Sequence, residues 1–210
     1  MRIQELEQQL QNRLAYPYHW GGVQNDRRDR ATDFVYATPD FDDFKTTFDN
    51  RFTGNPQYDE WFNYALNRWY NYWSARAVEE IFCALDGVTP ARNKKDRLVD
   101  FKIGRTRFDH KTSIFPQGFG HSLGYARHRP QELIEWLYRN QSQERRQHFK
   151  NRLFIVLYAH DGQHWTLKAQ VTWLRTLIEA YVADFEPSRL YQFSFDSKTI
   201  TLADIIWAVK

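Results

Sequence analysis

"LVDFKIGRTRFDHK" (residues 98–111) is the stretch that decides the fold of this 210-residue chain. It reads as two strands joined by a Gly104-Arg105 step, which suits a two-residue hairpin turn of type II′. Counting back from this turn sets Asp100 directly opposite Asp109. Like charges that face each other across a hairpin repel, so the register predicts that something compensates for them.

Side chains alternate between the two faces of a strand, so this hairpin has one apolar face and one charged face. The apolar face, suited to a core, holds Val99, Phe101, Ile103, Phe108 and His110. The charged face holds Asp100, Lys102, Arg107, Asp109 and Lys111. Two interpretations stay open: a bound divalent cation uses the carboxylates as ligands, or the neighbouring cations neutralise them on a solvated surface.

Hydrophobic periodicity predicts the remaining elements. Helices are expected over residues 2–14, 38–52, 57–85, 130–149 and 172–185, and strands over 97–103, 105–115, 152–160 and 190–195. Residues 116–130, rich in Gly and Pro, are expected to form a loop, and the last residues are ambiguous. This order predicts an α/β fold with an N-terminal helical extension over residues 1–56 and a core domain over residues 57–210.

Composition narrows the function classes only a little. A net charge of +3 and a pI near 8.9 permit a polyanionic partner without requiring one. The single cysteine, Cys83, excludes an internal disulfide framework and a cysteine-based zinc site. No serine-hydrolase, Walker or dinucleotide-binding motif is present. With no apolar signal peptide or spanning segment, a cytoplasmic protein without membrane contact is expected.

The hairpin and the elements around it resemble the PD-(D/E)XK nuclease superfamily, the restriction-endonuclease-like fold. Val99-Asp100 matches the first strand motif, Asp109-His110-Lys111 matches the second, and a helix with acidic residues precedes them. The resemblance covers roughly residues 70–200 and implies an α-β-β-α-β core with a mixed sheet flanked by helices. The chain departs from the family pattern in carrying Val99 for a proline and His110 for an apolar residue.

The resemblance implies a metal-dependent nuclease that hydrolyses phosphodiester bonds, with DNA as the expected substrate and Mg²⁺ or Mn²⁺ as the cofactor. Asp100, Asp109 and Glu79 would hold the metal together with the backbone carbonyl of His110, and Lys111 would orient the attacking water and the scissile phosphate. Glu79 is favoured over Glu80 because it lies nearer the apolar stripe of its helix. Restriction, defence and mobile-element settings are all consistent with this family, and a homodimer would allow cleavage of both strands.

Residues of the expected loop are candidate contacts to nucleic acid. Gln117, Arg127 and Arg129 could approach a phosphate backbone, although a surface loop of ordinary composition carries the same residues. A second interpretation of the whole chain is a catalytically inactive module of the same fold that binds nucleic acid or a protein partner. A third is an α/β scaffold in which Lys111 and Asp109 form a plain ion pair.

Overall fold

The computed structural model describes residues 2–91, 99–140, 149–195 and 199–210. The chain divides into two compact units. One comprises residues 1–78 and 168–173, and the other comprises residues 79–167 and 174–210. The division falls within a continuous helix, α4 (Tyr58–Cys83), whereas the boundary expected from sequence at residue 56 falls before this helix.

The first unit is helical and has an aromatic core. It contains α1 (Ile3–Asn12), α2 (Asp26–Ala31), α3 (Phe41–Phe52) and α4 as far as Val78, with short 3-10 helices over Arg13–Ala15 and Asp33–Tyr36. The apolar stripe of α3 is wholly buried, at positions Phe41, Phe44, Phe48 and Phe52. The expected N-terminal helices are confirmed. No helix was expected near residue 26, where Asn25 accepts a hydrogen bond from the Arg28 amide and caps α2.

The second unit contains the sheet. Its elements are β1 (Val88–Pro90), β2 (Phe101–Ile103), β3 (Thr106–Ile114), α5 (Leu123–His128), α6 (Pro130–Asn140), β4 (Arg152–Tyr158), most of α7 (Val171–Ala183), β5 (Tyr191–Phe193) and β6 (Thr201–Val209). Among the described residues, six strands form one sheet in the order β1-β2-β3-β4-β6-β5. The strands β3, β4 and β6 are parallel, and the outer pairs are antiparallel. The expected α/β class is therefore confirmed.

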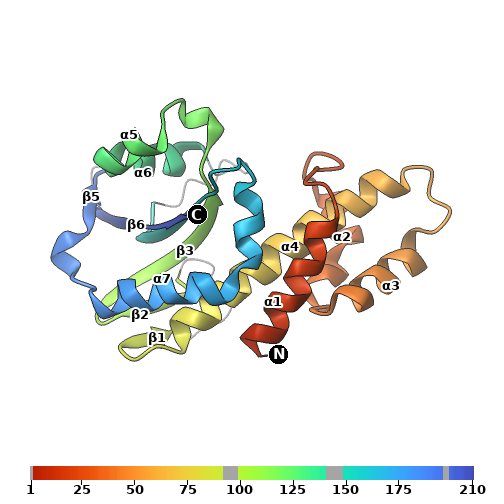
Figure 1. The fold of residues 1–210 in the computed structure, drawn as a ribbon, viewed down its shortest axis with the longest axis horizontal. Coiled ribbons are helices and arrows are strands. Elements are labelled where there is room, and N and C mark those ends of the chain that lie inside the picture. Colours follow the sequence, from red (N-terminus) through yellow and green to blue (C-terminus); the bar gives the residue numbers. More distant parts are fainter. Residues whose placement is uncertain (1, 92–98, 141–148, 196–198) are drawn as a thin grey trace. The chain divides into compact units, whose positions relative to one another are not determined.

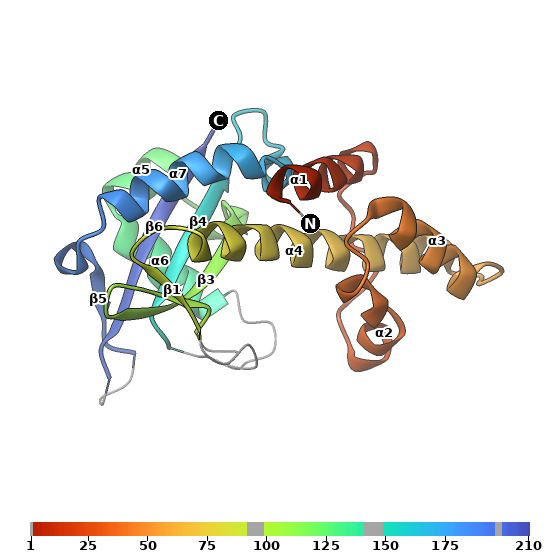
Figure 2. The same cartoon turned by 90° about the horizontal axis from the view of Figure 1, so that it is seen from below.

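Helices cover both faces of this sheet (Figure 1). One face packs on α5 and α6 through buried residues that include Leu133, Leu137, Phe154 and Ile205. The other face meets α7 and the last turn of α4, where the Phe82 ring stacks on Phe101 at 4.3 Å between centroids. The turned view in Figure 2 shows the strands passing between these helices.

The β2–β3 hairpin forms with the predicted register. Ile103 pairs with Thr106 and Phe101 with Phe108. Gly104 adopts a φ of +58°, the left-handed region that glycine enters without the steric penalty of a Cβ. Phe101, Ile103 and Phe108 are buried, as expected of the core face.

The register changes beyond Phe101. The amide of Asp100 donates to the carbonyl of Phe108 at 2.8 Å, although Phe108 already pairs with Phe101. Asp100 and Phe101 thus both lie opposite Phe108, which is the pattern of a β-bulge. Asp100 therefore precedes β2 and is not paired with Asp109 in the ladder, which corrects the prediction that these two residues lie directly opposite each other.

Other element boundaries differ from the sequence expectations. The helix expected over residues 130–149 ends at Asn140 in the described part, and residues 141–148 lie outside it, as do residues 97 and 98 of the expected first strand. The expected loop over 116–130 contains a 3-10 turn and α5, whose cap Ser122 accepts a hydrogen bond from the Tyr125 amide. β1 was not predicted, and the ambiguous C-terminus forms β6. Within the described ranges, none of the helices is long and apolar enough to cross a membrane.

Candidate functional site

The charged face of β3 meets the first residue of β4. Parallel pairing sets Asp109 beside Arg152, and Lys111 beside Phe154, so Asp109, Lys111 and Arg152 share the face that packs on α6. The Nε and Nη2 atoms of Arg152 lie 2.6 and 2.5 Å from Oδ2 of Asp109. These side chains are only 16% and 20% exposed, so the pair is shielded from water more than a surface ion pair would be.

Asp100 reaches the same strand through a different residue. Its Oδ2 atom accepts hydrogen bonds from the His110 amide at 2.8 Å and contacts the ring nitrogen Nδ1 at 2.7 Å. The His110 side chain is 5% exposed and its ring lies 6.1 Å from the Phe101 ring. The bulge thus brings the carboxylate of Asp100 onto His110, whose side chain was expected only to fill the core.

The two carboxyl groups interact with each other, and their pKa values move in opposite directions. Burial pushes the pKa of Asp100 up, but hydrogen bonds from His110 and one with the side chain of Asp109 outweigh it, so this pKa lies below its ordinary value. Burial and the charge of Asp100 raise the pKa of Asp109, against the opposing effect of Arg152. Two neighbouring acids with separated pKa values are typical of functional sites.

The pKa values of Lys111 and His110 are shifted as well, in opposite directions. Burial lowers the pKa of Lys111, and the nearby charge of Arg152 lowers it further, while Asp109 opposes both. Burial also acts to lower the pKa of His110, but its hydrogen bond to Asp100 prevails and raises it. The site therefore places like charges next to each other: Asp100 beside Asp109, and Lys111 beside Arg152.

The glutamates of α4 lie at the edge of this cluster. Glu79, in the last turns of α4, is close enough to His110 for its charge to raise the pKa of that ring. Glu79 and Glu80 are both partly buried. The electrostatic link to His110 favours Glu79, the residue preferred from the sequence.

The candidate nucleic-acid contacts lie at the other end of β3. Asp109 pairs with the first residue of β4, whereas Gln117 comes three residues after the end of β3 at Ile114. The three residues from Lys111 to the end of β3 span about 10 Å. Arg127 lies over the Trp207 ring at 5.9 Å, and Arg129 pairs with Glu132 at 3.2 Å. The fold therefore does not bring these loop residues together with the aspartates.

Arg152 is the site residue that sequence reasoning missed. The sequence gives one sign of it, because a charged residue begins the otherwise apolar run "RLFIVLY". Its partner could be named only by knowing that β4 pairs in parallel with β3 and in which register. The role of the His110 side chain was missed as well, because it depends on the bulge at Asp100.

The donor set suits a hard divalent cation in part. Asp100, Asp109 and the carbonyl of His110 supply oxygen atoms, the ligands that Mg²⁺ prefers. Among the residues that the structure describes, however, no group of three or more His, Cys, Asp or Glu side chains has the arrangement of a metal site. Mg²⁺ is commonly held by one or two carboxylates together with substrate phosphates and water, so two carboxylates fit that mode of binding.

Comparison with known proteins leaves the family open. No protein-family model matches the chain, and searches of curated proteins and of solved structures find no significant match.

Proposed function

We propose that this protein is a metal-dependent nuclease that hydrolyses phosphodiester bonds, with DNA as its substrate and a restriction-endonuclease-like core. The observation that carries the proposal is the placement of two acids at one end of a hairpin that also holds Lys111: Asp100 accepts from the amide of His110, and Asp109 is the residue just before it. The charge of each acid acts on the pKa of the other. Two adjacent acids in a partly buried setting cost stability unless they are compensated, and a bound cation is one group that would compensate them.

The element order supports the proposal. A helix with acidic residues leads into the hairpin, and the helices α5 and α6 lead to a strand parallel to β3. The sequence resemblance predicted this order, apart from the additional strand β1. The fold alone does not establish an activity, so the residues of the site carry the proposal.

Each residue of the site has a role in this chemistry. Asp100, Asp109 and the His110 carbonyl would hold Mg²⁺ or Mn²⁺, and Glu79 would support them from α4. The cation, when bound, would supply Lewis acidity toward the scissile phosphate. Lys111 holds the attacking water and stabilises the charge that develops on the phosphate. Arg152 restrains Asp109 by its paired hydrogen bonds.

Cleavage assays with Asp109→Asn test the proposal. Purified full-length protein is incubated with plasmid, linear duplex, single-stranded DNA and RNA, with Mg²⁺, with Mn²⁺ or with a chelator. We expect metal-dependent cleavage of DNA that falls by at least about a hundredfold in the variant, because one ligand carboxylate is lost.

Asp204→Asn is the matched control. Asp204 is a partly buried carboxyl on the same sheet, but it lies in β6 and accepts a hydrogen bond from Tyr181 at 3.0 Å. Asp204 pairs with Leu153, which on its other side pairs with His110. The side chain of Asp204 therefore points to the α7 face of the sheet. Equal cleavage by Asp109→Asn, Asp204→Asn and the parent chain would contradict the proposal.

A second candidate function has an observation in its favour. Arg152 and His110 already compensate the two carboxylates, which is how a catalytically inactive module that binds nucleic acid or a protein partner would stabilise the same fold. Such a module would bind its partner with equal affinity with and without Mg²⁺ and would leave every substrate uncut. The same assays, with binding measured in parallel, distinguish the two functions.

A further inference from the structure

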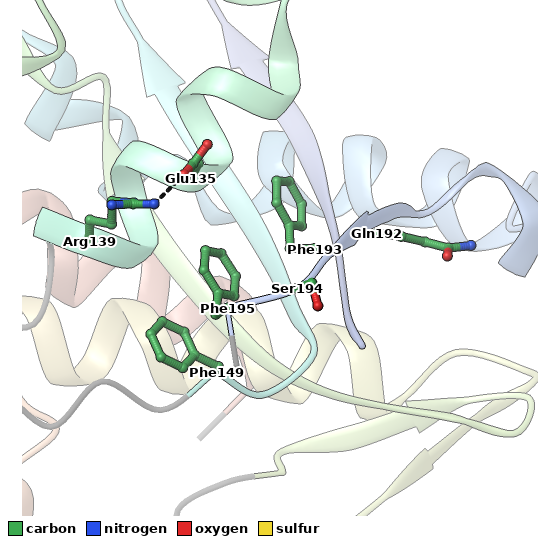
Figure 3. A pocket seen from close by; sticks show the side chains of 7 residues that line it. All are labelled: Glu135, Arg139, Phe149, Gln192, Phe193, Ser194 and Phe195. Atoms are coloured by element: carbon green, nitrogen blue, oxygen red, sulfur yellow. Dashed lines mark hydrogen bonds and ion pairs between the residues drawn. The ribbon is translucent and has the colours of Figure 1, made fainter. Parts of the chain in front are cut away.

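An aromatic pocket lies at the end of the second unit that also holds Asp109 and Arg152. Its volume is about 440 Å³, and its apolar lining consists of Phe149, Phe193 and Phe195. Figure 3 shows these rings in a row beside the end of α6, where Arg139 forms an ion pair with Glu135 at 2.5 Å. The volume falls within the range of pockets that bind small organic groups.

The three rings are close to parallel. Phe195 stacks on Phe149 at 4.5 Å with an interplanar angle of 14°, and on Phe193 at 5.5 Å with an angle of 8°. All three side chains are only partly buried. A row of parallel rings at a surface can be extended by another flat ring, as in proteins that stack the bases of single-stranded nucleic acid.

Side-chain contacts link this pocket to the acidic cluster. The Tyr138 ring lies 4.8 Å from the Phe195 ring, and the guanidinium of Arg152 lies 5.4 Å from the Tyr138 ring. Arg152 in turn pairs with Asp109. Two side chains, Tyr138 and Arg152, therefore separate the aromatic pocket from Asp109, one of the carboxylates that the proposed function assigns to phosphodiester cleavage.

A second groove, of about 320 Å³, adjoins the pocket and shares Phe149 with it. Arg107, Lys150 and Asn151 also line this groove. Arg107 and Asn151 stand next to the cluster, because the Asn151 side chain donates to the Arg107 carbonyl at 3.2 Å and the Asn151 carbonyl accepts from the Asp109 amide at 3.0 Å. Arg107, Lys150 and Arg139 thus place positive charge along the two hollows, with Glu135 as the acidic residue of the lining.

We propose that the aromatic pocket binds an unpaired base of the nucleic-acid substrate, while Arg107 and Lys150 contact the phosphates that lead to the cleavage site. The inference rests on the proposed function, which makes nucleic acid the expected occupant. Stacking recognises the flat base, and the cations recognise the backbone, so the two hollows match the two chemical parts of one strand. The preferred substrate is accordingly single-stranded DNA, or duplex DNA with an unpaired end or flap.

Binding measured in a chelator tests this inference independently of catalysis, because the proposed hydrolysis needs a metal ion. The probes are a labelled oligothymidylate of about 12 nucleotides and an abasic oligomer of the same length, which keeps the phosphates and lacks the bases. We expect the full-length protein to bind oligothymidylate about tenfold more tightly than the abasic oligomer, since stacking one base is worth roughly that factor. A matched oligoribonucleotide should bind less tightly than the oligodeoxynucleotide, and tighter binding of the RNA would overturn the preference for DNA.

Phe195→Leu is the decisive variant. Phe195 is the middle ring, stacked on both Phe149 and Phe193, so leucine keeps an apolar side chain against Tyr138 but breaks the row that a base would extend. Thermal unfolding should change little, while the preference for oligothymidylate over the abasic oligomer should disappear. Phe195→Trp enlarges the ring and should retain or increase the preference. Arg107→Gln should weaken binding of both oligomers alike and reduce the salt dependence of binding, because a phosphate contact is lost.

A second pair of stacked rings, Tyr125 of α5 on His121 at 4.2 Å, is an alternative surface on which a base could stack. The variant Tyr125→Leu tests this alternative. We expect this variant to bind both oligomers as the parent chain does. The inference is overturned if the two oligomers bind equally, if neither binds, or if Tyr125 rather than Phe195 supports the preference. It is also overturned if Phe195→Leu instead abolishes a dimer seen by sedimentation, because the pocket would then be a contact between two copies. Base-dependent binding without any metal-dependent cleavage would instead refute the nuclease.

Discussion

The two compact units bury charged side chains in different ways. In the helical unit, Arg13 is fully buried and donates to the carbonyls of Tyr16 and Pro17 and to Oδ1 of Asn67, at 2.6, 3.0 and 3.1 Å. In the sheet unit, Asp100 and Asp109 are neighbours, and so are Lys111 and Arg152. Hydrogen-bond acceptors thus surround Arg13, whereas each of these carboxylates in the sheet unit has a basic partner, Arg152 or His110, and also a second acid beside it.

This difference separates structural charge from candidate functional charge. The guanidinium of Arg13 joins a connecting segment to α4 through several hydrogen bonds, and its loss would leave those acceptors without their donor. The like-charge neighbours raise the free energy of the folded chain, and under the proposed function a bound cation or phosphate would compensate for them. Stability and activity should therefore respond in opposite ways to substitution in the two units.

The largest stability effect is expected at Arg13. Arg13→Met should lower the free energy of unfolding by about 3 kcal/mol, because buried carbonyls lose a charged donor. Arg51→Met is the matched control, since the ion pair of Arg51 with Asp33 is exposed and the substitution should change stability by less than about 0.5 kcal/mol. Urea denaturation of both variants measures the effects, and similar losses at the two positions would remove the distinction between the units.

Lys111→Met should separate stability from activity. Removing this ammonium relieves its desolvation and its repulsion by Arg152, so the free energy of unfolding should stay the same or rise by up to about 1 kcal/mol. Cleavage should fall by at least about a hundredfold, because the variant loses the group that we propose to orient water and phosphate. The two measurements are urea denaturation and the initial rate of DNA cleavage. A strongly destabilised variant would show instead that Lys111 serves the fold.

The smallest effect is expected at Asp204, on the α7 face of the sheet. Burial raises the pKa of Asp204 above its ordinary value, against hydrogen bonds from the Ile205 amide and from Tyr181. The folded chain then binds this proton more tightly than the unfolded chain does. Its contribution to stability therefore falls as pH rises through the raised pKa, and the cost is fully present at neutral pH.

Asp204→Asn should remove this pH dependence. The variant should gain up to about 1 kcal/mol of stability at neutral pH relative to the parent chain, with a smaller gain under acidic conditions. Denaturation curves for both chains at several pH values measure the difference. A gain that is constant with pH would mean that Asp204 does not titrate with a raised pKa.

Local patterns predicted much of this molecule. The Gly104-Arg105 turn and the alternation of side chains around it were sufficient for the hairpin and its buried face. Helical spacing located α1, α3, α4 and α7, and the continuous apolar run located β4. The nearness of Asp100, Asp109 and Lys111 followed from that register, because residues close to a tight turn are brought together by the turn itself.

The tertiary structure decided the rest. The bulge at Asp100 depends on how β2 meets both β1 and β3, and it directs the carboxylate onto His110 instead of setting it opposite Asp109 in the ladder. The pairing of Arg152 with Asp109, and the separation of Gln117, Arg127 and Arg129 from them, depend on the parallel register between β3 and β4. The sequence by itself determined which charges lie on one hairpin, because turn geometry is local. Which partners compensate those charges was decided by strands that meet from distant parts of the chain.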